Sequence, residues 1–174
     1  MMKVNCNRPF FQIAWIVDDL AAAVQQWLSQ GVGPFYMFPH APLIEYRYRG
    51  SPSTVDFSVA LAQYGEMQIE LIQQHDDCPS QYRDSFAPGQ SGFHHMARLT
   101  TDIDADLEMY RKQGFEAAAE GISGDMRFAY IDTRSALGHM TEVMENKPSI
   151  LAMFETVTKG SEGWDGSDPV RSIL

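Results

Sequence analysis

The stretch Gln12-Ile-Ala-Trp-Ile-Val-Asp-Asp-Leu20 decides the fold because the chain contains a second version of it. That version, His95-Met-Ala-Arg-Leu-Thr-Thr-Asp-Ile103, begins 83 residues later. The same offset matches an alanine, an aspartate and a glycine in the two copies: Ala14 with Ala97, Asp19 with Asp102, and Gly31 with Gly114. Matched strand, cap and turn positions indicate an internal duplication. Each copy opens on a side chain able to bind a metal, which predicts one shared site.

The composition narrows the class of protein. A chain of 174 residues is long enough for one domain or two small fused modules. A net charge of -10 disfavours phosphate backbones and anionic lipid as partners. Cys6 and Cys78 make no disulfide framework, and no apolar run approaches the roughly 20 residues that a bilayer span needs. We therefore expect a cytoplasmic protein that binds neither nucleic acid nor membrane.

Hydrophobic periodicity predicts the same order of elements in both copies. Residues 10–17 alternate as a strand buried on both sides, and Asp18 or Asp19 caps a helix that Gly31 ends. Further strands are predicted at 33–38, 55–63 and 67–73. The second copy predicts a strand at 93–100, a helix at 103–113 and strands near 115–119, 126–133 and 139–145. Both copies are thus βαβββ modules.

The chain divides into four regions on this basis. They are a first module (1–74), a linker (75–91), a second module (92–147) and a C-terminal helix and tail (148–174). The first module has 11 extra residues, which we place around 39–53. Tyr46, Arg47 and Tyr48 in this insertion are candidate substrate-binding residues at a mouth or lid, and the alternative is a solvated loop with an added strand.

Four polar side chains stand at equivalent places in the two modules. Gln12 or His95 opens the first strand, and Glu70 or Glu142 interrupts an apolar last strand. A buried ionised glutamate requires a compensating cation, donor or proton. If the modules pair about a pseudo-twofold axis, one amide oxygen, one imidazole nitrogen and two carboxylates reach a single concavity. Such a set suits a divalent metal with open positions.

Taken singly, each of these residues has an ordinary structural alternative. Gln12 can bond to backbone, His95 can be a satisfied core histidine, and the two glutamates can be edge-strand carboxylates. Their matched placement in two repeats favours the shared site. Strand alternation places His94 and His139 on the opposite face, where packing is the favoured role.

The residues from Phe10 to Glu145 resemble the vicinal oxygen chelate superfamily, which includes glyoxalase I, methylmalonyl-CoA epimerase, extradiol dioxygenases and antibiotic-resistance proteins. The motifs that carry the resemblance are Gln12-Ile-Ala-Trp-Ile-Val-Asp-Asp-Leu, Met67-Gln-Ile-Glu-Leu-Ile, Gly92-Phe-His-His-Met-Ala and Leu137-Gly-His-Met-Thr-Glu-Val. The resemblance implies an α+β fold, with tandem βαβββ modules forming a curved, partly open eight-stranded mixed sheet around a metal-binding cavity. It also implies that Gln12, Glu70, His95 and Glu142 bind the metal, which would be Zn, Ni, Co, Mn or Fe.

The ligand set is similar to that of glyoxalase I, whereas Gly33-Pro-Phe-Tyr and Phe128-Ala-Tyr-Ile-Asp-Thr are similar to the epimerase branch. The resemblance implies an isomerase or lyase that moves a proton next to the carbonyl of a small carbonyl or thioester substrate. Glu142 or Glu70 would move the proton. Glu45 is a further candidate base without a reliable alignment. An extradiol-type dioxygenase and a non-catalytic binding protein are the alternatives, and a homodimer is expected by resemblance.

Overall fold

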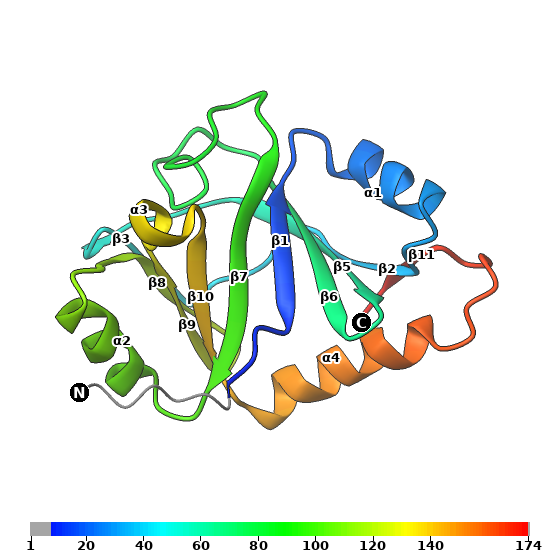
Figure 1. Ribbon diagram of the computed structural model, residues 1–174. Helices are drawn as coiled ribbons and strands as arrows, with labels where there is room; N and C mark the ends of the chain where they lie inside the picture. Colours follow the sequence, from blue (N-terminus) through cyan, green and yellow to red (C-terminus); the bar gives the residue numbers. More distant parts are fainter. Residues whose placement is uncertain (1–7, 174) are drawn as a thin grey trace.

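The computed structural model describes residues 8–173, which form one open mixed sheet with four helices (Figure 1). The first repeat supplies β1 (Gln12–Ile16), α1 (Leu20–Ser29), β2 (Phe35–Phe38), β3 (Glu45–Tyr48), β4 (Ser51–Pro52), β5 (Phe57–Tyr64) and β6 (Met67–Gln74). The second supplies β7 (Gly92–Thr100), α2 (Ile103–Lys112), β8 (Ala117–Ser123), β9 (Met126–Ile131), α3 (Arg134–Leu137) and β10 (Met140–Glu145). Helix α4 (Pro148–Ser161) and strand β11 (Val170–Ser172) follow.

The sheet reflects the duplication. Its strand order is β11-β2-β5-β6-β1-β7-β10-β9-β8-β3-β4. β1 runs parallel to β6, β7 runs parallel to β10, and β1 and β7 pair antiparallel at the centre. The first strand of each module therefore meets its counterpart at the junction, as Figure 1 shows for the blue β1 and the green β7. This junction brings the two predicted half-sites together.

The predicted α+β class and mixed sheet are confirmed, but the predicted strand number was wrong. The described residues contain an eleven-stranded sheet rather than an eight-stranded one. Two of the extra strands, β3 and β4, come from the insertion in the first module, and β3 pairs antiparallel with β8 of the second module. The third, β11, pairs parallel with β2. Each extra strand covers an edge whose backbone groups would otherwise lack partners.

The two helices predicted at equivalent places, α1 and α2, begin with the same kind of cap. Asp19 accepts a hydrogen bond from the Ala22 amide at the start of α1, and Asp102 accepts one from the Ala105 amide at the start of α2. Such caps satisfy backbone N–H groups that a helix start leaves free. Gly31 ends the first unit with a φ of 80°, a left-handed conformation that favours glycine.

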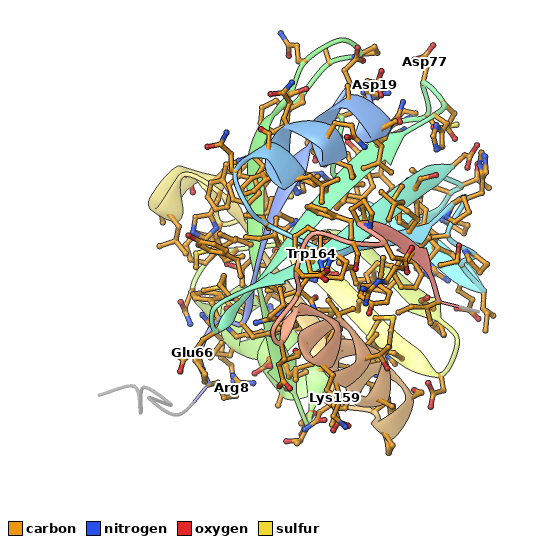
Figure 2. All side chains as sticks on the ribbon, turned by 90° about the vertical axis from the view of Figure 1, so that its right-hand side faces the viewer. Arg8, Asp19, Glu66, Asp77, Lys159 and Trp164 are labelled. Carbon is orange, nitrogen blue, oxygen red and sulfur yellow. The ribbon has the colours of Figure 1, made fainter. Side chains whose placement is uncertain are left out.

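The helices lie on two different faces of the sheet. α1 buries Leu20 and Val24 on the outer face of the first module, and α2 buries Ile103 and Tyr110 on the outer face of the second. α4 crosses the inner face and contacts β5. Figure 2 labels Asp19, which precedes α1, near the top of the view and Lys159 of α4 near the bottom. The inner face is thus partly covered, and it carries the predicted ligands.

The tail after α4 returns to the first module. The Trp164 ring lies so close to Gly33 that a Cβ atom at residue 33 would come within 2.7 Å of it. Trp164 is labelled at the centre of Figure 2. None of the helices in residues 8–173 is long and apolar enough to cross a bilayer.

Candidate metal centre

The four predicted ligands lie in two adjacent rows across the centre of the sheet. The rows, read through strand register, are Glu70–Ala14–His95 and Gln12–Ala97–Glu142. Each row has an alanine in its middle, and both alanines are fully buried. A methyl group is the smallest side chain with a Cβ, so these two positions leave space above the sheet. The longer side chains on either side can converge there.

Three of the four ligands converge on one point. The Nε2 atom of His95 lies 3.1 Å from Glu142 Oε2 and 3.3 Å from Glu70 Oε2. One potential ligand atom from each of the three residues lies within 4.8 Å of the others. All come from a single chain. Gln12 lines the same cavity as the two glutamates.

The hydrogen bonds of these side chains show which of their polar atoms remain free to bind a metal. Among the described residues, the buried atoms Gln12 Oε1, Glu70 Oε2 and His95 Nε2 make no hydrogen bond of good geometry, although Glu70 Oε2 and His95 Nε2 face each other as an ion pair. Gln12 Nε2 donates to Gln68 Oε1 at 2.6 Å, which leaves its carbonyl oxygen free. Buried polar atoms without partners are uncommon and call for an explanation. A divalent cation satisfies oxygen and imidazole donors of this kind at once, so the residues fit a metal.

Electrostatics at the site favour a positive charge. Burial opposes a charge on His95, but Glu142 and Glu70 outweigh this effect and raise the pKa of His95 to about 9. Burial raises the pKa of Glu70. The two carboxylates therefore stabilise a cation between them, and a proton on His95 serves this purpose in the metal-free protein.

A cavity of about 430 Å³ opens above the ligands. Gln12, Glu70 and Glu142 form a polar patch on its wall, and Tyr82 and Tyr130 add two hydroxyls. The rest of the lining is almost entirely apolar and comes from the end of β2 and the loop after it, from β5, from the β8–β9 hairpin, from β10, from α4 and from the residue after β11. These residues are Met37, Phe38, Pro39, Ala41, Pro42, Leu43, Phe57, Val59, Leu61, Ser123, Met126, Phe128, Met144, Ile150, Met153, Phe154 and Ile173. None of the described lining residues is Lys, Arg or His.

Comparison with protein families identifies the architecture. Residues 11–130 match the model of the glyoxalase/bleomycin resistance protein/dioxygenase superfamily. The chain belongs to this superfamily. The predicted resemblance is therefore confirmed, and the matched segment contains three of the four candidate ligands, while Glu142 lies beyond its end.

Solved structures share the fold. A hypothetical protein from Bacillus halodurans has a TM-score of 0.56 at 19% identity, covering 81% of this chain and 96% of its own. Methylmalonyl-CoA epimerase from Mycobacterium tuberculosis has a TM-score of 0.53 at 17% identity, covering 87% and 97%. A methylmalonyl-CoA epimerase in complex with methylmalonyl-CoA and NH4+ has a TM-score of 0.52 at 17% identity, covering 81% and 96%. No curated protein sequence matches the chain.

The predicted substrate-binding residues of the insertion lie away from this cavity. Tyr46 donates a hydrogen bond to Gln81 at 2.6 Å, and Tyr48 donates one to Asp84 at 2.6 Å. Arg47 lines a separate, smaller hollow together with Glu45. None of the three belongs to the described cavity lining. The insertion reaches the cavity through its first residues instead, because residues 39 and 41–43 line it.

The prediction that His94 faces away from the site was wrong. Ala14 pairs with His95 and Trp15 pairs with Phe93, so His94 is an extra residue in β7. A bulge of this kind re-aims a side chain, which regular alternation cannot anticipate. The Nδ1 atoms of His94 and His95 lie 3.0 Å apart. His139, by contrast, precedes β10, and its ring contacts Phe93 outside the cavity lining.

Three residues of the site were missed by the sequence analysis: Gln68, Tyr82 and Tyr130. Gln68 stands two residues before Glu70 and therefore shares its face of β6, a signal that alternation could have given. Burial raises the pKa of both tyrosines well above the usual value, so they remain neutral hydroxyls. They can donate a hydrogen bond to a ligand in the cavity.

A second group of potential metal-binding side chains lies at the surface. His40 Nδ1 is 2.7 Å from Asp56 Oδ1, and His75 is close enough for one ligand atom of each residue to lie within 4.8 Å of the others. The side chains of His40 and Asp56 are 67% and 45% exposed. Exposed groups satisfy their polar atoms with water, so this cluster lacks the electrostatic need seen at His95.

Replacement of Gln68 by leucine is expected to weaken metal binding about tenfold, because Gln12 loses the acceptor that orients its amide. Isothermal titration with Co2+ measures the effect. Gln73→Leu on the same strand is the matched control, since Gln73 bonds the backbone of Leu20 and Asp18 instead. Equal affinities for the two variants would show that Gln68 does not orient Gln12.

Proposed function

We propose that the protein is a divalent-metal-dependent isomerase or lyase that moves a proton on the carbon next to a substrate carbonyl. The observation that carries the proposal is the convergence of two carboxylates, one imidazole and one free amide oxygen, all buried, on the wall of an apolar cavity. A proton-transfer enzyme of this class needs a site for the developing negative charge, a base and a dry environment. The described residues offer all three.

Gln12, Glu70, His95 and Glu142 would hold the ion, which we propose to be Zn, Ni, Co, Mn or Fe. A bound divalent ion would polarise a carbonyl oxygen and stabilise the negative charge that develops on it. Superfamily membership supports the choice of a metal, and the reaction is our inference from the donor set.

The two glutamates are the candidate proton carriers. Glu70 and Glu142 approach the His95 ring from opposite modules, through β6 and β10. Both line the cavity, so a carboxylate oxygen of either one can reach a substrate carbon. Two carboxylates beside one bound substrate can remove a proton from one position and return it at another. Tyr82 and Tyr130 would orient the substrate by donating hydrogen bonds from their neutral hydroxyls.

The lining of the cavity favours an apolar carbonyl compound over a phosphate-bearing thioester. A compound of this kind would bury its hydrocarbon part against the aromatic and aliphatic side chains and place its oxygen at the polar end. A volume of about 430 Å³ suits a small ligand. One structural neighbour is a complex with methylmalonyl-CoA, so a thioester remains the comparison to test.

Three of the arginines that could bind a phosphate have other partners, while Arg47 lies in the smaller hollow and donates a hydrogen bond to the Gly50 carbonyl. Arg49 lies 2.8 Å from Asp132, and Arg127 lies 2.8 Å from Asp104. The guanidinium of Arg98 lies 4.0 Å from the centre of the Phe10 ring. None of these belongs to the described cavity lining. Recognition of phosphate needs cations that are free to pair with it, so the charge pattern supports an uncharged substrate.

The four candidate ligands also bear on the alternative reaction, ring cleavage by an iron-dependent dioxygenase. A non-haem iron dioxygenase of the common type uses two histidines and one carboxylate. Here one histidine stands with two glutamates and one glutamine, which favours Lewis-acid chemistry over activation of dioxygen. A binding protein without catalysis would have no need for two carboxylates aimed at one imidazole.

Solvent deuterium exchange tests the proposal. The protein loaded with each candidate metal is incubated in D2O with 2-oxoaldehydes, alkyl and cyclic ketones, and a 2-methylacyl-CoA, and exchange is followed by NMR. We expect metal-dependent exchange into an apolar carbonyl compound, with a higher kcat/KM than for the CoA thioester. A preference for the thioester would contradict the substrate class alone. A protein that binds the carbonyl compound but binds no metal and catalyses no deuterium exchange would contradict the catalytic function.

A further inference from the structure

The bulge in β7 brings two consecutive histidines to the same side of the sheet. His94 and His95 are both buried, with side-chain nitrogens 3.0 Å apart. In a regular strand they would point to opposite faces. The bulge between Ala14 and Trp15 of the partner strand removes this alternation and places the His94 ring directly behind the candidate ligand.

The hydrogen bonds of His94 determine where its proton lies. Its Nε2 atom is 3.0 Å from the backbone carbonyl oxygen of Gln81. A carbonyl oxygen only accepts, so the His94 Nε2 carries the hydrogen. None of the ion pairs among residues 8–173 involves His94, and a buried ring without a counter-ion is neutral. Its Nδ1 is therefore an acceptor.

The same reasoning fixes the proton on the ligand. Only one hydrogen fits between the Nδ1 atoms of His94 and His95 at 3.0 Å, and His94 does not supply it. His95 must donate from its Nδ1. A neutral His95 ring then has its lone pair on Nε2, the atom that lies between Glu70 and Glu142. The order of donors runs from His95 through His94 to the Gln81 carbonyl.

We propose that His94 is a positioning residue that holds His95 in the tautomer able to bind a metal through Nε2. The inference rests on the proposed metal site. Aromatic rings keep His94 in place, since Tyr82 and Tyr130 lie 5.5 Å and 5.9 Å from it between ring centres. Partners behind a metal-binding histidine typically change metal affinity by about 10 to 100-fold when they are removed.

Three substitutions separate this role from simple packing. His94→Asn can place an amide oxygen near the original Nδ1 and so accept from His95. His94→Gln places its amide nearer the original Nε2 and keeps only the contact with Gln81. His94→Phe retains the ring but has no nitrogen. His139→Phe is the matched control, because it removes a half-buried histidine that lies outside the cavity lining.

Two readouts are needed, metal affinity and the hydrogen bond donated by His95 Nδ1. Titration with Co2+ should show dissociation constants raised about 10 to 100-fold in His94→Phe and His94→Gln, and within about threefold of the parent in His94→Asn and His139→Phe. NMR of the 15N-labelled metal-free protein should show a His95 Nδ1–H that is hydrogen-bonded to residue 94 in the parent and in His94→Asn, whether or not Nε2 also carries a proton. This hydrogen bond is expected to be absent in His94→Phe and in His94→Gln.

The outcomes distinguish the positioning role of His94 from the proposed metal-dependent function. Unchanged affinity and an unchanged His95 Nδ1–H signal in His94→Phe would overturn the role of His94. If His94→Phe does not fold, equal behaviour of His94→Asn and His94→Gln in both readouts would overturn it as well. If the parent protein binds no metal, the proposed function fails, while the NMR measurement on metal-free protein still decides whether His94 orients His95.

Discussion

Replacement of Glu142 by glutamine is expected to lower the rate of proton exchange by at least about 100-fold, because an amide cannot act as a base. The same change weakens metal binding, since Glu142 Oε2 lies 3.1 Å from His95 Nε2 and supplies half of the negative charge there. The shape of the side chain is preserved, so the fold should persist. Deuterium exchange and Co2+ titration on the purified variant measure the two effects.

Glu145→Gln provides the matched control on the same strand. Glu145 accepts a hydrogen bond from the Arg127 amide and lies outside the described cavity lining. We expect this control to keep the metal affinity and exchange rate of the parent. Retention of exchange in Glu142→Gln would remove Glu142 from the mechanism and leave Glu70 as the remaining carboxylate.

Ala97→Leu is expected to abolish metal binding while leaving all four ligands present. Ala97 is fully buried and lies between Gln12 and Glu142 in its row of the sheet. A leucine would fill the space into which these side chains converge and would push at least one of them aside. Overpacking of this kind also lowers the free energy of unfolding by about 1–3 kcal/mol. Titration with Co2+ and urea unfolding measure the two consequences.

Ala129→Leu separates the loss of the site from the loss of stability. Ala129 is also fully buried, but it belongs to the core under α2 on the outer face of the sheet. We expect a similar decrease in the free energy of unfolding and an unchanged metal affinity. If Ala97→Leu bound Co2+ as tightly as Ala129→Leu, the ligands would not converge above the alanine rows.

The repeat allowed the central part of the site to be predicted from sequence. A constant offset preserves both strand register and helix caps, so Gln12 and His95 had to occupy equivalent places beside the junction of the modules. Glu70 and Glu142 interrupt the last apolar strand of each module, so pairing of the modules was expected to bring them to the same concavity. Local patterns carry this information because strand periodicity and capping depend on neighbours in the chain.

The parts that were not predicted depend on contacts between distant segments. The bulge at His94 arises from how β7 pairs with β1. The extra residue is a histidine and not a glycine or proline, so its residue type does not predict a bulge. The pairing of β3 with β8 joins an insertion in one module to an edge of the other. No local pattern specifies such partners, so the strand number and the position of Tyr46 were beyond reach.

The proposed substrate class likewise required three-dimensional information. Counting arginines in the sequence left a phosphate-bearing substrate open. The ion pairs of Arg49 and Arg127 with aspartates distant in the chain are what separate these cations from the cavity. The cover provided by α4 is a further case, because its apolar stripe predicts a packed helix without indicating which face of the sheet it meets.

The most direct test of the central claim is an anomalous diffraction map, recorded at the cobalt edge from crystals grown with excess Co2+. The structure predicts one strong peak about 2 Å from His95 Nε2 and within bonding distance of Glu70 and Glu142. A peak confined to the surface group of His40, Asp56 and His75, or no peak at all, would contradict the metal centre and favour a binding protein without catalysis.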